Sequence, residues 1–350
     1  MDTVINTITD FVKSLDAELR VFDMGRRLYR LSNKQFQTFE NFETPYPTPL
    51  QRHAWLGILI WWKETKEEPL IWFLKLPLDE QGIIIPASRD DFIQRLMKAI
   101  QNRVHNPETR DQSILSESEL AFTPNQERMA AFHAKISHFL NKNASSFYEP
   151  AISYLKKEQE VDSWDTIGLQ GLADVCARLE DMNHEEVIKS SLKWLPETPK
   201  MLVLTLLENE IPSTDLSLTI LDLARQELAQ STPNPTLLAA YLRAMSGSKA
   251  ATPRQELIIE MLANDQVNNN LELISAIASR CWKDLENESL CFQLFECIAQ
   301  MDSGEYIFIQ FYSDLVAIPG VRPWLMAVIR STERSEALSK CIGVLFNGIK

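Results

Sequence analysis

Apolar residues recur at helical spacing along most of this chain, with one exception near its start. Residues 3–19 place apolar side chains every third or fourth position, with Asp10, Asp16 and Glu18 on the opposite face, which predicts an amphipathic helix. Between residues 20 and 85 the pattern changes to short, dense apolar runs separated by Gly and Pro. That change predicts β-strands.

The predicted strands form two hairpins. Gly25-Arg26 suits a two-residue turn in the middle of residues 20–31. Segments 54–62 and 70–76 are rich in Ile, Leu and Trp, which predicts a second antiparallel pair, and a short fifth strand is expected at 82–85.

A helix is predicted to begin at Ser88 and to end near Asn102, because Ser is a favoured N-cap residue. The next residues, 104–122, are polar and poorly periodic, which predicts a linker or a long loop. Residues 1–103 are therefore expected to form a small α+β module with an antiparallel sheet.

The second half of the chain carries a recurring helix-start signature, an N-cap residue directly before a proline. It occurs at Thr123-Pro124, Thr198-Pro199, Asn234-Pro235 and Thr252-Pro253. Helix starts are expected near residues 197, 214, 235, 253, 269, 287, 304, 321 and 334, so a helix pair spans roughly 35 residues.

This spacing predicts an α-helical repeat-like domain over residues 123–350, of the α-solenoid or HEAT-like kind. An irregular helical bundle would give much the same pattern. Gly168 and Gly171 lie within one apolar helical stripe, where their small size would let a neighbouring helix approach closely. The predicted fold class is thus α+β, a small N-terminal module followed by a mostly α-helical array.

Composition and charge narrow the possible partners. The net charge of −13 disfavours binding to nucleic acid and to anionic membranes, and most of the excess lies in residues 121–350, at −10. The longest apolar run, 55–62, is too short to cross a membrane, and no export signal is visible. We therefore expect a cytoplasmic protein without membrane insertion. Its cysteines are expected to be reduced buried thiols: Cys176, Cys281, Cys291, Cys297 and Cys341.

Motifs that would indicate an enzyme or a metal site are missing from the sequence. There is no glycine-rich phosphate loop, no nucleophile elbow and no C-x-x-C pair. His184-Glu185-Glu186 begins like a zinc-protease helix, but position 188 is Ile, so a helix N-terminus with acidic residues is favoured. We expect no catalytic residue, no metal and no cofactor, and His53 is the histidine hardest to dismiss.

Two groups of residues are candidates for partner binding. Basic side chains gather on the first hairpin, at Arg20, Arg26, Arg27 and Arg30 with Lys34 beyond, and could form a patch for an acidic partner. Aromatic side chains gather on the second hairpin, including Trp55, Trp61, Trp62, Trp72 and Phe73. We single out Arg26, Arg27, Arg30, Trp61 and Trp62 as candidate partner-binding residues. The alternative for the arginines is a solvated edge that prevents strand-to-strand aggregation, and the alternative for the tryptophans is packing in the core.

Several stretches of the N-terminal half are similar to a known family. They are Arg20 to Arg27, Pro45-Tyr46-Pro47, His53 to Gly57 and Leu76 to Gly82. The chain resembles an uncharacterised bacterial family known as a domain of unknown function, and the similarity runs over most of its length. The resemblance implies a bacterial cytoplasmic origin and brings no activity, cofactor or catalytic residue.

Three functions are compatible with the sequence. The favoured one is a non-enzymatic interaction scaffold or adaptor that binds a protein partner through an acidic helical-repeat surface. The second is an enzyme whose active site is assembled from distant residues of the N-terminal module, for instance around His53 and Arg27. The third and least favoured is nucleic-acid binding through the arginine hairpin, because the net charge opposes it.

Overall fold

The chain folds into two compact units, residues Met1–Pro124 and Asn125–Lys350, which we call the N-terminal unit and the helical unit. The structure is a computed structural model that describes residues 6–62, 69–105, 118–181 and 183–347. Most of the predicted linker, residues 106–117, lies outside the described residues.

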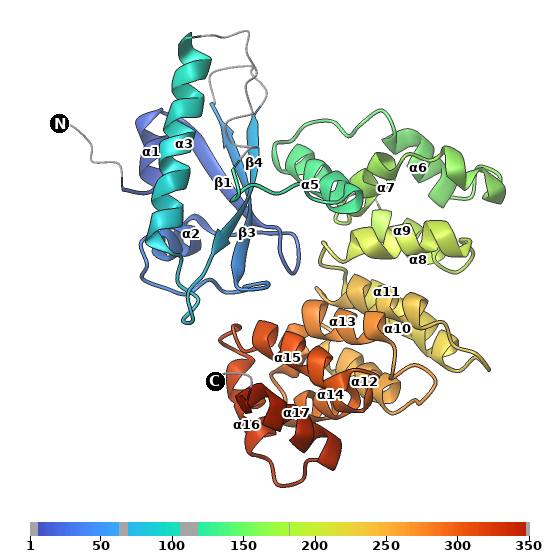
Figure 1. Cartoon of the computed structure of the whole chain (residues 1–350). Helices are drawn as coiled ribbons and strands as arrows, with labels where there is room; N and C mark the ends of the chain where they lie inside the picture. The colour runs from blue at the N-terminus through green and yellow to red at the C-terminus, as the bar shows by residue number, and fades with distance from the viewer. Residues whose placement is uncertain (1–5, 63–68, 106–117, 182, 348–350) are drawn as a thin grey trace. The chain divides into compact units, whose positions relative to one another are not determined.

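The N-terminal unit is a four-stranded antiparallel sheet with helices on one face (Figure 1). The strands lie in the order β2-β1-β3-β4. The elements are α1 (Ile8–Ser14), β1 (Glu18–Asp23), β2 (Tyr29–Arg30), α2 (Asn33–Glu40), β3 (His53–Trp61), β4 (Leu70–Pro77) and α3 (Pro86–His105).

The core of this unit lies between the sheet and the three helices. Alternate residues of a strand face opposite sides, so β3 directs Ala54, Leu56, Ile58 and Ile60 toward the helices. The register places Ile58 between Val21 of β1 and Trp72 of β4. The helices complete this core with apolar side chains that are all buried: Ile8, Phe11, Val12, Phe36, Phe39, Phe92, Ile93 and Leu96.

The two long strands and the helix after Ser88 confirm the predictions within a few residues, whereas the first helix is shorter than predicted. Helix α1 ends at Ser14, because Asp16 adopts a left-handed backbone conformation (φ 53°) that reverses the chain. Residues 18 and 19 then belong to β1. Helix α2 was not predicted, although Ser32 and Gln35 form a capping box at its start.

Two further details of the sheet differ from the predictions. The first hairpin has no two-residue turn: five residues, 24–28, join β1 to β2, and the side chain of Arg26 turns inward among them. Residues 82–85 do not form a fifth strand, and only an isolated bridge joins Leu78 to Ile84.

The helical unit contains the remaining described helices. They are α5 (Gln126–Phe139), α6 (Tyr148–Leu155), α7 (Leu169–Cys176), α8 (His184–Ser191), α9 (Glu197–Leu207), α10 (Thr214–Leu228), α11 (Pro235–Met245), α12 (Ala251–Leu262), α13 (Leu271–Arg280), α14 (Glu288–Gln300), α15 (Gly304–Leu315), α16 (Arg322–Arg330) and α17 (Glu336–Asn347), with short 3-10 helices at Val161–Thr166 and Trp282–Leu285.

These helices pack in two rows (Figure 1). In one row α5, α7, α9, α11 and α13 follow one another, and in the other α6, α8, α10, α12 and α14 do so. Helices α15, α16 and α17 pack on and around α14. A mostly helical array after a small α+β module is the fold class that the sequence predicts.

The predicted helix starts agree with the structure, but most of the predicted caps do not. Asn234 is the N-cap of α11 and accepts from the amides of Thr236 and Leu237 at 3.1 and 3.2 Å, with Pro235 at the first helical position. Near the three Thr-Pro pairs the N-caps are instead Asn125, Pro196 and Ala250. Pro124 precedes α5, whereas Pro199 and Pro253 lie in the first turns of α9 and α12, where proline is tolerated because those amides lack partners within the helix.

The predicted close approach at Gly171 is confirmed. A Cβ atom added there would lie 2.1 Å from the backbone oxygen of Phe147 and 2.9 Å from the Cβ of Ala151 in α6. Helices α6 and α7 can therefore pack at this distance only because residue 171 has no side chain.

Candidate functional site

A buried polar network fixes the loop between β1 and β2. The carboxylate of Asp23 accepts hydrogen bonds from the hydroxyl of Tyr46, from Thr48 Oγ1 at 2.8 Å and from the amide of Gly25 at 2.8 Å. Tyr29 joins it through a 3.0 Å hydrogen bond between its hydroxyl and that of Thr48. Since its donors and acceptors satisfy one another, this network organises the loop around Arg26.

The five predicted partner-binding residues occupy different environments. Arg26 is completely buried, and its Nε donates to the carbonyl oxygen of Pro49 at 2.8 Å, so this side chain is part of the interior. Arg27 is half-buried, and Arg30 is exposed on β2. Trp61 is half-buried beneath the guanidinium of Arg20, which lies 5.3 Å from the ring centroid.

Trp62 lies on the helix side of the sheet. Its indole nitrogen donates to the carbonyl oxygen of Leu15 at 3.1 Å, and its ring packs against the core. The structure therefore brings Arg20 and Trp61 together but separates Arg26 and Trp62 from them. The five predicted residues therefore do not share one surface.

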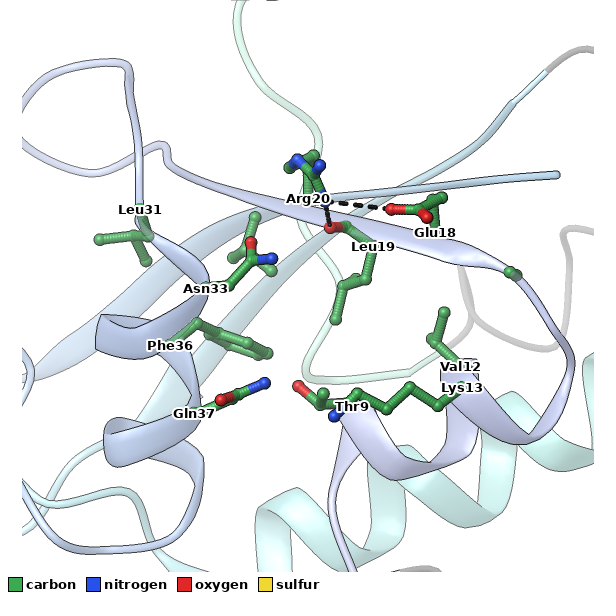
Figure 2. Close-up of a pocket in the computed structure, with 12 residues that line it drawn as sticks. Thr9, Val12, Lys13, Glu18, Leu19, Arg20, Leu31, Asn33, Phe36 and Gln37 are labelled. Carbon is green, nitrogen blue, oxygen red and sulfur yellow. Dashed lines mark hydrogen bonds and ion pairs between the residues drawn. The ribbon is translucent and has the colours of Figure 1, made fainter. Parts of the chain in front are cut away.

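A small pocket lies between α1, β1 and α2 (Figure 2). Its volume is about 170 Å³, and its apolar walls are Val12, Leu19, Leu31 and Phe36. Figure 2 shows the side chain of Leu19 directed into this space, whereas that of Arg20 points away from it. Sequence reasoning missed the pocket because α2, which supplies one wall, was not predicted.

Glu40 is a buried carboxyl group close to this pocket. It is 1% exposed, and its Oε2 accepts from the backbone amide of Thr9, in the first turn of α1, at 3.2 Å. Burial raises the pKa of Glu40 from 4.5 to about 7, although hydrogen bonds from Thr9 partly offset that effect. This group therefore titrates near neutral pH.

A cluster of charged residues joins helices of the first row in the helical unit. Glu208, at the end of α9, accepts from Arg128 of α5 at 3.0 Å and from Arg280 of α13 at 3.2 Å. Burial by itself would raise the pKa of Glu208, but the two arginines outweigh it and hold the pKa below its ordinary value. Because its partners are more than 70 residues away in sequence, no local pattern could have predicted this cluster.

A larger cleft of about 670 Å³ opens between α8, the start of α10 and Lys249. Ile211 lies in it and is 65% exposed. Four carboxylates and two lysines line the cleft: Glu180, Glu185, Glu186, Asp215, Lys189 and Lys249. Lys189 bridges Glu186 at 2.9 Å and Asp215 at 2.6 Å. Because carboxylates outnumber lysines, the lining has an excess of negative charge.

Hydrogen bonds hold two of the histidines, His184 and His53. His184 is buried at the first position of α8, where its Nδ1 lies 2.7 Å from the carbonyl oxygen of Arg178 and its Nε2 lies 2.7 Å from the hydroxyl of Tyr148. The helix start predicted at His184, with acidic residues in its first turn, is confirmed. His53 Nδ1 lies 2.7 Å from the carbonyl oxygen of Gln51.

The cysteines are free thiols, of which Cys297 is half-buried and the other four are buried. Burial raises the pKa of the Cys291 thiol to about 12 and that of Cys297 to about 11, so neither is a reactive thiolate near neutral pH. Over the described ranges, no group of three or more His, Cys, Asp or Glu side chains is placed to hold a metal ion. No helix in the described part of the chain is long and apolar enough to cross a membrane.

Comparison with known proteins identifies a family without an assigned activity. No curated protein and no solved structure matches this chain. A family model described as "Protein of unknown function (DUF3549)" matches residues 3–346. Because this match spans nearly the whole sequence, the chain belongs to that family.

Proposed function

We propose that this protein is a non-enzymatic adaptor that binds a protein partner through its helical unit. The observation that carries the proposal is the cleft around Ile211. Ile211 is 65% exposed in a cleft lined by four carboxylates and two lysines, so it offers an apolar anchor point within a rim of net negative charge. The partner would supply an apolar side chain flanked by Lys or Arg.

A repeating arrangement of helix pairs supports this proposal. Helices α9, α11 and α13 begin at Glu197, Pro235 and Leu271, in steps of 38 and 36 residues, and α10, α12 and α14 follow one another in two steps of 37. Such spacing is typical of stacked helix pairs in α-solenoids, whose extended surfaces bind other proteins.

Equivalent positions in successive helix pairs also have the same structural role. Asn234 and Asn270, 36 residues apart, are both N-caps that accept from the amides two and three residues ahead. Side chains connect neighbouring pairs at the same interval: Asn234 donates to Glu197 at 3.0 Å, and Thr236 donates to Glu272 at 2.8 Å. We also propose that the protein works in the cytoplasm of a bacterium.

The test is affinity capture from the native lysate with the full chain as bait, followed by mass spectrometry. Ile211→Asp removes the apolar anchor, and Tyr306→Asp is the matched control because Tyr306 is equally exposed, at 67%, but does not line the cleft. We expect a partner that the wild-type chain and Tyr306→Asp both retain, and whose recovery Ile211→Asp reduces by at least about tenfold.

Two results would contradict the proposal. Equal recovery by Ile211→Asp and by the control would show that the cleft is not the binding surface. The adaptor function itself would be contradicted if the wild-type bait retained no protein although its circular dichroism showed that it was folded.

A further inference from the structure

The pocket between α1, β1 and α2 has an apolar floor and a polar rim. Half of its twelve lining residues are apolar and half are polar. The apolar half includes Val12, Val21, Leu31 and Phe36, each at most 3% exposed, so side chains of the core form the floor. Pockets for small molecules share this character, because apolar walls supply contact and a few polar groups orient the ligand.

Two helices supply the polar rim. Thr9 and Lys13 are four residues apart in α1, and Asn33 and Gln37 are four apart in α2, so each pair lies on one face of its helix. Figure 2 shows Thr9 and Lys13 reaching from α1 toward Gln37 of α2. Because Lys13 and Asn33 are exposed, this rim lies on the solvent side of the pocket.

The rim holds hydrogen-bond donors that a ligand can use. In the described part of the chain, the side-chain nitrogens of Lys13, Asn33 and Gln37 are engaged in no hydrogen bond or ion pair. A lysine ammonium has three N–H donors and each carboxamide has two. A carboxylate accepts through both of its oxygens and is therefore the acceptor that these three side chains suit together.

The charges of the lining favour a single negative charge on the ligand. The charged lining residues are Lys13, Arg20 and Glu18, a net charge of +1. Nη1 of Arg20 lies 3.5 Å from Oε2 of Glu18 and donates to the carbonyl oxygen of Leu19 at 2.6 Å, and its side chain points away from the pocket (Figure 2). Lys13 is thus the cation of the described lining that a ligand would meet, and one cation matches a monoanion.

The size of the pocket limits the apolar part of the ligand. Its volume of about 170 Å³ is close to that of an engineered apolar cavity, about 150 Å³, that holds benzene. Pockets for drug-sized ligands are larger, at about 300–1,000 Å³. One six-membered ring, or a branched chain of similar size, therefore fills the floor. The charged group stays at the rim, because a carboxylate among apolar side chains would lose its hydration without compensation.

We propose that this pocket binds a small monocarboxylic acid that carries one aromatic ring or one branched aliphatic chain. The apolar part lies on the floor, and the carboxylate accepts from Lys13 and from the carboxamides of Asn33 and Gln37 at the rim. This small-molecule site belongs to the N-terminal unit and goes beyond the adaptor function, which uses the cleft around Ile211. Either site can therefore be disproved without the other.

The experiment titrates the full chain with phenylacetate, followed by ligand-observed NMR and calorimetry. We expect a dissociation constant of about 1 mM or below, as suits a ligand of this size. Acetate lacks the ring and phenylacetamide lacks the charge, so each should bind at least about fivefold more weakly than phenylacetate. Phenylacetamide that binds as tightly as phenylacetate would overturn the assignment of a carboxylate.

A pair of charge reversals tests the rim. Lys13→Glu places a carboxylate where the ligand carboxylate should lie and should weaken phenylacetate binding by at least about tenfold. Lys34→Glu makes the same change at an exposed residue of α2 that does not line the pocket, and it should bind like the wild type. Gln37→Trp, which fills the pocket, and Gln81→Trp, at an exposed turn, form a second pair with the same expected contrast.

Hydrogen exchange locates the bound ligand. Saturation with phenylacetate should slow exchange in peptides from α1 and α2 and leave the helical unit unchanged. Protection that is absent from α1 and α2 would overturn the proposal, and so would a folded wild-type chain that binds no phenylacetate at about 10 mM. Equal affinity of the folded members of both variant pairs would overturn it as well.

Discussion

At the scale of single residues, Glu40 couples the stability of the N-terminal unit to pH. Its native pKa of about 7 lies above the 4.5 of an ordinary glutamate, so between these values the folded chain binds more protons than the unfolded chain. The free energy of unfolding therefore falls as the pH rises from about 4.5 to about 7. The loss is at most about 3 kcal/mol, and it is complete above the native pKa.

The substitution Glu40→Gln should abolish this dependence, because an amide cannot lose a proton. We expect hydrogen exchange in peptides from α1 and α2 to be slower in Glu40→Gln than in the wild type at pH 8, by about tenfold or more, and equal at pH 5. Glu43→Gln is the matched control, since Glu43 is exposed three residues away. A wild type that is as well protected at pH 8 as Glu40→Gln would contradict the burial effect.

At the scale of helices and strands, local pattern predicted most elements and failed where a distant contact decides. The dense apolar runs of β3 and β4 needed no other information, because strands buried on one or both faces must be apolar. Helix α2 was not predicted, although Ser32 with Gln35 and the pair Phe36 and Phe39 signalled it. The pocket was lost together with that helix.

In the first hairpin, too, a distant contact made the prediction from local pattern fail, here at the single side chain of Arg26. A Gly-Arg dipeptide between apolar runs predicts a tight turn and an exposed arginine. In the structure Arg26 is buried and donates to Pro49, 23 residues later in the sequence. Nothing in residues 20–31 specifies that acceptor, so the wider loop could not be predicted from them.

Gly171 offers a prediction for the packing of α6 against α7. Gly171→Ala would place a methyl group 2.1 Å from the carbonyl oxygen of Phe147, and a backbone atom cannot move aside as a flexible side chain can. We expect it to lower the free energy of unfolding of the helical unit by about 1–3 kcal/mol or more, measured by urea denaturation.

The control for that change is Gly343→Ala in α17. An added Cβ there meets nothing within 4 Å, so the gain in helix propensity should stabilise the unit by up to about 1 kcal/mol. If both alanine variants changed stability in the same direction, the steric explanation for Gly171 would be wrong.

At the scale of the whole molecule, each unit has its own core, so we expect each to unfold as a separate cooperative unit. Tyr46→Phe deletes the hydroxyl that donates to the buried carboxylate of Asp23, at a cost of about 1–3 kcal/mol. Hydrogen exchange of the full chain should then accelerate throughout the described residues of the N-terminal unit, 6–62, 69–105 and 118–122, and stay unchanged in the helical unit. Gly171→Ala should have the opposite distribution.

This pair of variants separates two models of the protein. If the two cores are energetically independent, a binding event at the Ile211 cleft stabilises only the helical unit. Acceleration of exchange in both units by either variant would instead show one cooperative molecule, in which occupancy of one surface changes the stability of the other. Tyr306→Phe, at an exposed tyrosine, should change neither unit and controls for the substitution itself.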